Sequence, residues 1–182
     1  MGHGKAPPAR ILWEKAAFNA THRSTHTMPQ LSLHSPLGPL TLSEEDGKII
    51  SLDWGWGRDQ TETPLLCQAR DWLDKWFDEP QALGAFPFPL EPFGTEYQKK
   101  VWAALCTIPT GEITTYKSLA EKVGGSPRSI GQAVGRNPIP VLIPCHRVVG
   151  SHGLGGYSGD GGVDDKKWLL DLEEATLPAF KK

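Results

Sequence analysis

The chain has 182 residues, of which 38% are hydrophobic and 22% are charged, and these proportions are typical of globular rather than disordered proteins. No run of about 18 apolar residues occurs, which excludes a transmembrane helix, and the N-terminus lacks the apolar stretch of a secretory signal. Three cysteines are too few, and odd in number, for a disulfide framework, so we expect a reducing compartment, the cytoplasm.

The net charge of −2 conceals an uneven distribution. Residues 31–91 carry a large excess of Asp and Glu, whereas residues 111–150 carry more Lys and Arg than Asp and Glu. A surface that binds phosphates needs local positive potential, not a basic chain as a whole. The charge pattern therefore leaves nucleic-acid binding open without establishing it.

The first half of the chain predicts a tail and then a small α/β domain. Residues 1–29 show no hydrophobic period and are expected to form the tail. Three short runs of strand character follow, the last two separated by a hairpin signal, Asp46-Gly47. A helix is predicted from Thr63-Pro64 to Phe77, where apolar residues recur at helical spacing. We place this domain at residues 30–91.

A proline-rich stretch, 79–92, predicts a linker, and a mostly helical domain is expected over residues 92–178. Thr95 to Gln98 forms a capping box that opens a helix with an apolar stripe. Cys67 and Cys106 both fall within predicted helices, where we interpret them as structural residues.

Two short helices separated by Gly124-Gly125 predict a helix-turn-helix, with Ser126-Pro127 opening the second helix. The second helix carries small residues, for which close helix packing and close approach to a nucleic-acid groove are competing explanations. Arg128 in its first turn would project toward the duplex. The small residues are Gly131, Ala133 and Gly135.

Residues 139–149 have the pattern of a buried strand, interrupted by Pro144-Cys145-His146-Arg147. Proline removes a backbone donor, so the sheet should break there and present a thiol beside an imidazole and a guanidinium. Cationic neighbours and a nearby base lower the pKa of a thiol, and the thiolate is the nucleophile. The run therefore marks Cys145 as a candidate reactive cysteine.

Several motifs, in this order, resemble the O6-alkylguanine-DNA alkyltransferases (methylated-DNA–protein-cysteine methyltransferases). The resemblance is strong over roughly residues 93–174 and covers the first domain only in outline. The motifs are Gly94-Thr95-Glu96-Tyr97-Gln98, Val101-Trp102, Gly111-Glu112 with Tyr116, Arg136-Asn137-Pro138, Pro144-Cys145-His146-Arg147-Val148-Val149, Gly156-Tyr157-Ser158-Gly159 and Trp168-Leu169-Leu170.

The resemblance implies catalytic roles. Cys145 would be the alkyl acceptor, and His146 would take the thiol proton through a water molecule while Glu173 orients the imidazole. Taken by its position alone, Glu173 would be an ordinary solvated carboxylate. Asn137 would brace the turn that carries the active site. Tyr116 would donate a proton to the leaving base.

The resemblance also implies a partner, double-stranded DNA that contains O6-alkylguanine. Tyr116 and Ser158 would hydrogen-bond the flipped guanine, and Arg128 would fill the gap that the extruded nucleotide leaves. Lys117 and Ser151 would contact phosphates. We expect a monomer without a membrane or an obligate protein partner.

No metal or organic cofactor is expected, because transfer to a thiol requires neither and because Cys67 and the histidines match no ligand spacing. The loop 159–167 is about two residues longer than is usual in the family, so the sequence does not fix the shape of this wall of the base pocket. Three other functions remain as alternatives: a lesion binder without chemistry, which would lack the acceptor cysteine; a cysteine hydrolase, which would need an oxyanion hole; and a transcriptional regulator, which would carry a sensor domain.

Overall fold

The N-terminal part of the molecule is a three-stranded antiparallel sheet, as seen in a computed structural model that describes residues 28–177. The predicted tail lies almost entirely outside the described residues. The strands are β1 (Gln30–Ser35), β2 (Gly38–Glu45) and β3 (Lys48–Trp54), in the order β1-β2-β3. They confirm the three predicted strand runs. Asp46 and Gly47 both adopt positive φ, 49° and 73°, the geometry of the hairpin turn that their sequence predicts.

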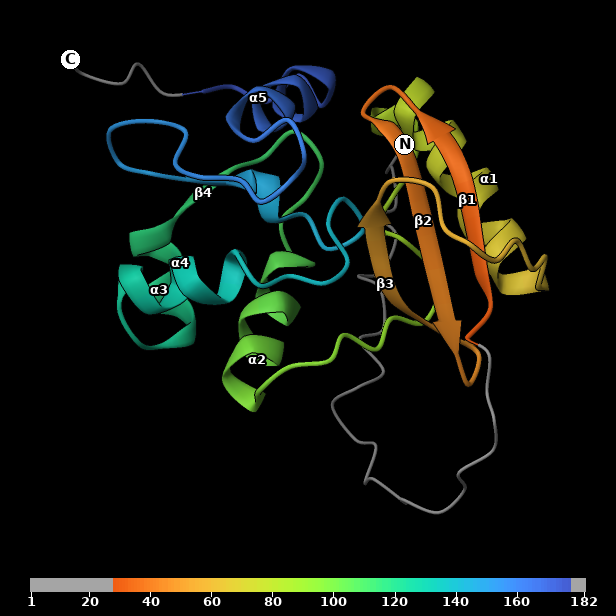
Figure 1. The fold of residues 1–182 in the computed structure, drawn as a ribbon. Helices are drawn as coiled ribbons and strands as arrows, with labels where there is room; N and C mark the ends of the chain where they lie inside the picture. The colour runs from red at the N-terminus through yellow and green to blue at the C-terminus, as the bar shows by residue number, and fades with distance from the viewer. Residues whose placement is uncertain (1–27, 178–182) are drawn as a thin grey trace, which may run out of the picture.

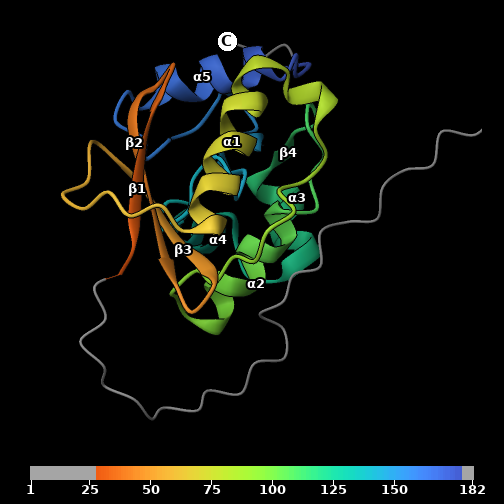
Figure 2. The same cartoon turned by 90° about the vertical axis from the view of Figure 1, so that its right-hand side faces the viewer.

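Helix α1 (Pro64–Asp78) crosses one face of this sheet (Figure 2). Its N-terminus is capped by the Thr63 side chain, which accepts a hydrogen bond from the Leu66 backbone N–H, and Pro64 occupies the first turn. The apolar stripe that predicted the helix faces the sheet and forms the core there. The buried residues of α1 are Leu66, Ala69, Leu73, Trp76 and Phe77.

The interpretation of residues 79–92 as a linker is wrong, because this segment packs against the sheet as part of the N-terminal core. It begins with a short 3-10 helix, η2 (Pro80–Ala82), and then runs parallel to β3. Ile49 donates its backbone N–H to the Pro89 carbonyl, and Glu91 donates to the Ile49 carbonyl. Two apolar side chains of this segment, Phe86 and Leu90, are buried.

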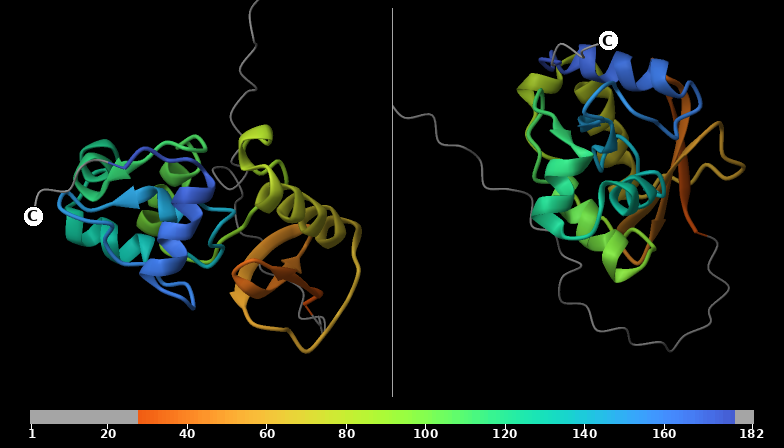
Figure 3. Two further views of the ribbon diagram at one scale, coloured as in Figure 1. Left: turned by 90° about the horizontal axis from the view of Figure 1, so that it is seen from above. Right: turned by 90° about the vertical axis from the view of Figure 1, so that its left-hand side faces the viewer.

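The C-terminal part lies beside the sheet and α1 and is mostly helical (Figures 1 and 3). The small N-terminal sheet domain and helical C-terminal part agree with the predicted fold class. Within residues 28–177, no helix combines the length and the apolar character needed to cross a membrane. The C-terminal elements are α2 (Glu96–Leu105), β4 (Thr114–Thr115), α3 (Tyr116–Val123), α4 (Pro127–Val134), η3 (Cys145–Arg147), β5 (Val148–Val149) and α5 (Val163–Leu172).

The predicted buried strand over residues 139–149 is wrong except at its end. Residues 139–144 form tight turns, in which Ile143 donates its N–H to the Ile139 carbonyl and Val141 adopts a φ of 69°. Prolines at 138, 140 and 144 remove backbone donors that a strand would need. Only Val148–Val149 pairs, in parallel, with β4.

Candidate active site

Cys145 and His146 lie on η3, a single turn of 3-10 helix that follows Pro144. The backbone N–H of Cys145 donates to the Ile143 carbonyl at 2.7 Å, which fixes the turn. The structure buries the whole turn: Cys145 is 2% exposed, and His146 is fully buried. The proline in the sequence therefore marks the start of this buried turn, and strand pairing begins only after it, at Val148.

Glu173, at the C-terminal end of α5, lies against His146 although 27 positions separate them in sequence. Its Oε1 lies 2.9 Å from His146 Nε2, and both side chains are fully buried. Arg147 donates three further hydrogen bonds to the same carboxylate, from Nε to Oε2 at 2.9 Å and to Oε1 at 3.2 Å, and from Nη2 to Oε1 at 2.6 Å. Glu173 is thus a buried anion, not the solvated carboxylate that its position alone suggested.

The protonation states of this group follow from burial and contact. Burial alone would raise the pKa of Glu173, but hydrogen bonds from His146 and the contact with Arg147 lower its pKa to about 2. Burial lowers the pKa of His146, so its imidazole is neutral near pH 7. The anionic carboxylate can only accept, so Nε2 carries the proton. Nδ1, which has no partner among the described residues, is then a free acceptor.

The Cys145 thiol does not have the lowered pKa that its cationic neighbours predicted. Burial raises its pKa, and this outweighs the opposing effects of the Asn137 side chain and Lys166. The guanidinium of Arg147 is engaged by Glu173 and the Ile108 carbonyl. The resting Cys145 side chain is therefore a thiol, and it could act as a nucleophile only after a base removed its proton.

Asn137 bridges the turn that precedes the cysteine. Its Nδ2 donates to the Ile143 carbonyl at 2.8 Å, and its Oδ1 accepts from the Ile139 N–H at 3.0 Å. The Ile143 carbonyl and the Ile139 N–H have no strand partner, because the prolines around them prevent a regular sheet. The side chain is 8% exposed and satisfies buried backbone groups, as a bracing residue would.

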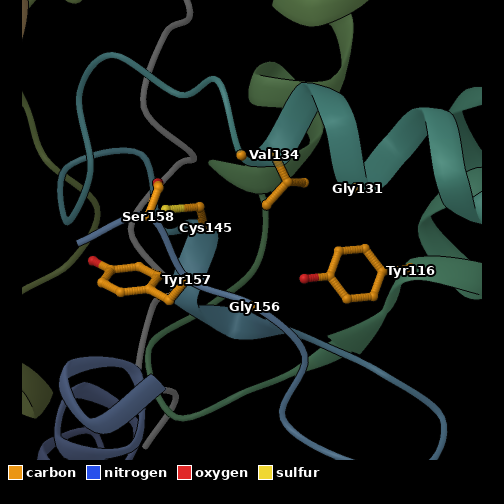
Figure 4. Close-up of a pocket in the computed structure, with 8 residues that line it drawn as sticks. Tyr116, Gly131, Val134, Cys145, Gly156, Tyr157 and Ser158 are labelled. Carbon is orange, nitrogen blue, oxygen red and sulfur yellow. The ribbon is translucent and has the colours of Figure 1, made fainter. Parts of the chain in front are cut away.

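A cavity of about 380 Å³ opens beside Cys145, a volume within the range of small-molecule sites. Figure 4 shows the Tyr116 hydroxyl pointing into it from the side opposite Cys145, with Ser158 next to the cysteine. The cavity thus brings together three residues that were predicted to adjoin the substrate: Cys145, Tyr116 and Ser158. The remaining lining residues are Gly131, Val134, Gly135, Gly156 and Tyr157.

The small residues of α4 do not form one bare face. Gly131 and Gly135, one helical turn apart, line the cavity, whereas Ala133 is fully buried and its carbonyl accepts a hydrogen bond from Trp102 Nε1. Positions i and i+2 of a helix point in different directions. Close packing therefore explains Ala133, whereas the two glycines line the cavity, and close approach of this helix to a nucleic-acid groove stays a prediction.

The residues predicted to contact phosphates or to fill the gap left by the flipped nucleotide lie outside the cavity and on the surface. Arg128, in the first turn of α4, and Lys117, in the first turn of α3, are exposed. Ser151, directly after β5, is also exposed. No contact in the structure tests their predicted roles.

Lys166 is a site residue that the motifs did not identify. It is fully buried, and its Nζ donates to the carbonyls of Val148 and Gly156 at 2.6 and 3.1 Å. Nζ also lies 5.9 Å from the centroid of the Tyr116 ring. Burial lowers its pKa to about 8. Its spacing from Leu169 and Leu170 places it on the apolar face of α5, a signal that could have identified it.

The described residues contain no group of three or more His, Cys, Asp or Glu side chains arranged to hold a metal ion. The three cysteines are unpaired. Burial raises the pKa of Cys106 to about 12, so its thiol stays protonated.

Comparisons with known proteins agree on one family. Residues 30–90 match the model of the 6-O-methylguanine DNA methyltransferase ribonuclease-like domain, and residues 96–175 match that of the 6-O-methylguanine DNA methyltransferase DNA binding domain. A methylated-DNA–protein-cysteine methyltransferase of Methanosarcina barkeri is 41% identical over 159 residues, or 80% of this chain and 96% of that protein. A Mycobacterium tuberculosis protein of the same name is 37% identical, over 81% of this chain and 93% of that protein.

Solved structures show the same likeness. The Mycobacterium tuberculosis O6-methylguanine methyltransferase superimposes with a TM-score of 0.71 at 34% identity, covering 84% of this chain and 96% of that one. The Mycobacterium tuberculosis OGT protein in complex with DNA gives a TM-score of 0.69 at 36% identity, covering 80% and 92%. The chain therefore belongs to the methylated-DNA–protein-cysteine methyltransferase family.

Proposed function

We propose that this protein repairs DNA by moving an alkyl group from O6-alkylguanine, and also from O4-alkylthymine, onto its own Cys145. The observation that carries the proposal is the buried series Cys145, His146 and Glu173 beside an open cavity. A nucleophile, a neutral base and an anionic orienting group in this order are what an activated thiol requires.

The proposed reaction uses the protonation states described above. His146 Nδ1 accepts the Cys145 proton through a water molecule, while Glu173 stabilises the imidazolium that forms. The sulfur attacks the saturated alkyl carbon, a C–S bond forms, and the bond from that carbon to guanine O6 breaks. The departing base takes the bonding electrons and receives a proton from the Tyr116 hydroxyl.

The product is a thioether, which water does not cleave under these conditions, so one protein molecule removes one alkyl group and is then spent. The thiol supplies the electron pair for the new bond, and the proposed step uses no metal or organic cofactor. Titrating a fixed amount of O6-methylguanine duplex with protein tests this stoichiometry. We expect repaired lesions to equal the moles of active protein, and continued turnover would refute it.

The damaged base must leave the duplex to reach a cavity lined by Cys145, and extrusion costs a few kcal/mol. We propose that α3, the Gly124-Gly125 turn and α4 act as a helix-turn-helix that docks on the DNA. Arg128 would then fill the vacated space, and Lys117 and Ser151 would contact phosphates. Support comes from the position of α4, which carries Arg128 at its start and lines the cavity further along.

Within the cavity, Tyr116 and Ser158 would hydrogen-bond the flipped guanine. We propose residues 30–91 and 92–178 as the two domains of a monomer, and the three unpaired cysteines favour a cytoplasmic location. A lesion binder that only flips the base is the second candidate, but the positioned Cys145 favours transfer.

A further inference from the structure

The N-terminal domain touches residues that support the active site. The backbone N–H of Leu52 on β3 donates to the Pro138 carbonyl at 3.0 Å, directly after the bracing Asn137. Gln81 of η2 donates from Nε2 to the backbone carbonyl of Glu173 at 2.5 Å. The two contacts come from different elements of the N-terminal domain, and each ends at or beside a proposed catalytic or bracing residue.

A third contact reaches the proposed base itself. The indole of Trp76, on α1, lies with its centroid 6.3 Å from that of the His146 ring, at an interplanar angle of 64°. Trp76 is 2% exposed. Its ring also packs with Trp72, stacked at a centroid distance of 6.4 Å, and with Phe77, edge-on at 5.3 Å. The indole is therefore a fixed apolar wall against an imidazole that is itself fully buried.

We infer that Trp76 is a positioning residue for His146, through which the N-terminal domain completes the active site. The indole fixes one side of the imidazole and keeps bulk water from it, while Glu173 fixes Nε2. Nδ1 then remains the acceptor available to the Cys145 thiol. This inference rests on the proposed transfer of the alkyl group to Cys145.

The role of the Trp76 indole can be measured through the pKa of His146, which depends on burial and on the charges nearby. The Glu173 carboxylate at the end of α5 raises the pKa of His146, whereas Arg147 on η3 and Lys166 on α5 lower it. The largest cause of the lowered pKa is burial, and Trp76 is the aromatic group that α1 contributes to that burial. Removing the indole should admit water and raise the pKa of the base. A higher pKa moves the acid limb of the reaction to higher pH, because only neutral imidazole accepts the thiol proton.

The test is the single-turnover rate of Cys145 benzylation by free O6-benzylguanine, measured across pH for wild type and variants. This substrate needs no base extrusion, so DNA binding does not enter. We expect the acid limb to shift up by about one pH unit in Trp76→Leu, as expected when a buried imidazole is solvated. Trp76→Phe, which keeps one aromatic ring, should shift by less in the same direction.

Leu73→Ala is the matched control, because Leu73 is fully buried one turn earlier on α1. We expect it to lower the melting temperature and leave the acid limb in place. A wild-type acid limb in Trp76→Phe overturns the inference whether or not the leucine variant folds, and so does an equal shift in Leu73→Ala. A wild-type protein that gains neither a benzyl group from free O6-benzylguanine nor a methyl group from an O6-methylguanine duplex would instead refute the proposed function.

Discussion

The substitution Glu173→Gln tests the buried charge network, because it removes one negative charge and nearly keeps the shape of the side chain. Glu173 is fully buried and the Arg147 side chain is 9% exposed, so the variant leaves a guanidinium without its counterion. Removing one partner of a buried ion pair costs about 3–5 kcal/mol. The lowering of the Glu173 pKa from 4.5 to about 2 corresponds independently to ~3 kcal/mol at neutral pH.

The same pKa gives the pH dependence of the effect. Because the folded pKa of Glu173 lies below its unfolded value, the stabilisation is complete above pH 4.5 and is lost as the pH falls through about 2. We therefore expect Glu173→Gln to lower the free energy of unfolding by ~3 kcal/mol at pH 7. The difference from wild type should shrink between pH 4.5 and 2.

Urea unfolding of both proteins across this pH range measures the effect. The control is Glu174→Gln, at the exposed neighbouring carboxylate, which should change stability little. A loss below about 1 kcal/mol at pH 7, the range of surface ion pairs, would refute the reasoning. So would a loss that stays constant down to pH 2.

Three further substitutions test other parts of the account. Gly155 has a φ of +76°, and an added Cβ would lie 2.9 Å from the Tyr116 ring, so Gly155→Ala should slow benzylation of Cys145 by about 10- to 100-fold. Gly153→Ala, which has open space around it, should react at the wild-type rate, and equal benzylation rates in the two variants would contradict this prediction. Arg128→Ala should slow repair of duplex DNA at least about tenfold and leave the reaction with free O6-benzylguanine nearly unchanged, and equal losses on both substrates would assign Arg128 to the fold or the cavity. Cys145→Ala should abolish transfer yet keep DNA affinity that falls steeply with salt, and salt-independent binding would argue against phosphate contacts.

The N-terminal sheet and α1 could be predicted from the sequence because local signals and tertiary packing agree there. Apolar residues alternate along the strands, and Asp46-Gly47 supplies the two positive φ angles that the hairpin needs. Thr63 and Pro64 begin α1 where the cap and the fixed proline φ favour it. The end of α3 and the start of α4 were predictable for the same reason, because Gly124-Gly125 and Ser126-Pro127 mark them.

The active-site turn could be recognised as a motif but not predicted as a shape. Its apolar residues match a strand, and only the buried contacts of Asn137 explain how residues 139–144 satisfy their backbone groups without a sheet. The sequence also did not show that the Arg147 side chain points to Glu173, because this carboxylate lies 26 positions away along the chain. The sequence placed Trp76 correctly in the apolar stripe of a helix, but its contact with His146 joins the two halves of the molecule and has no local signal.

The central claim is tested most directly by the mass of the intact protein after incubation with duplex DNA that contains O6-methylguanine, followed by peptide mapping. The account predicts a gain of one methylene mass per molecule, located on the peptide that carries Cys145. A label on Cys67 or Cys106, or loss of the lesion with no gain in protein mass, would contradict it.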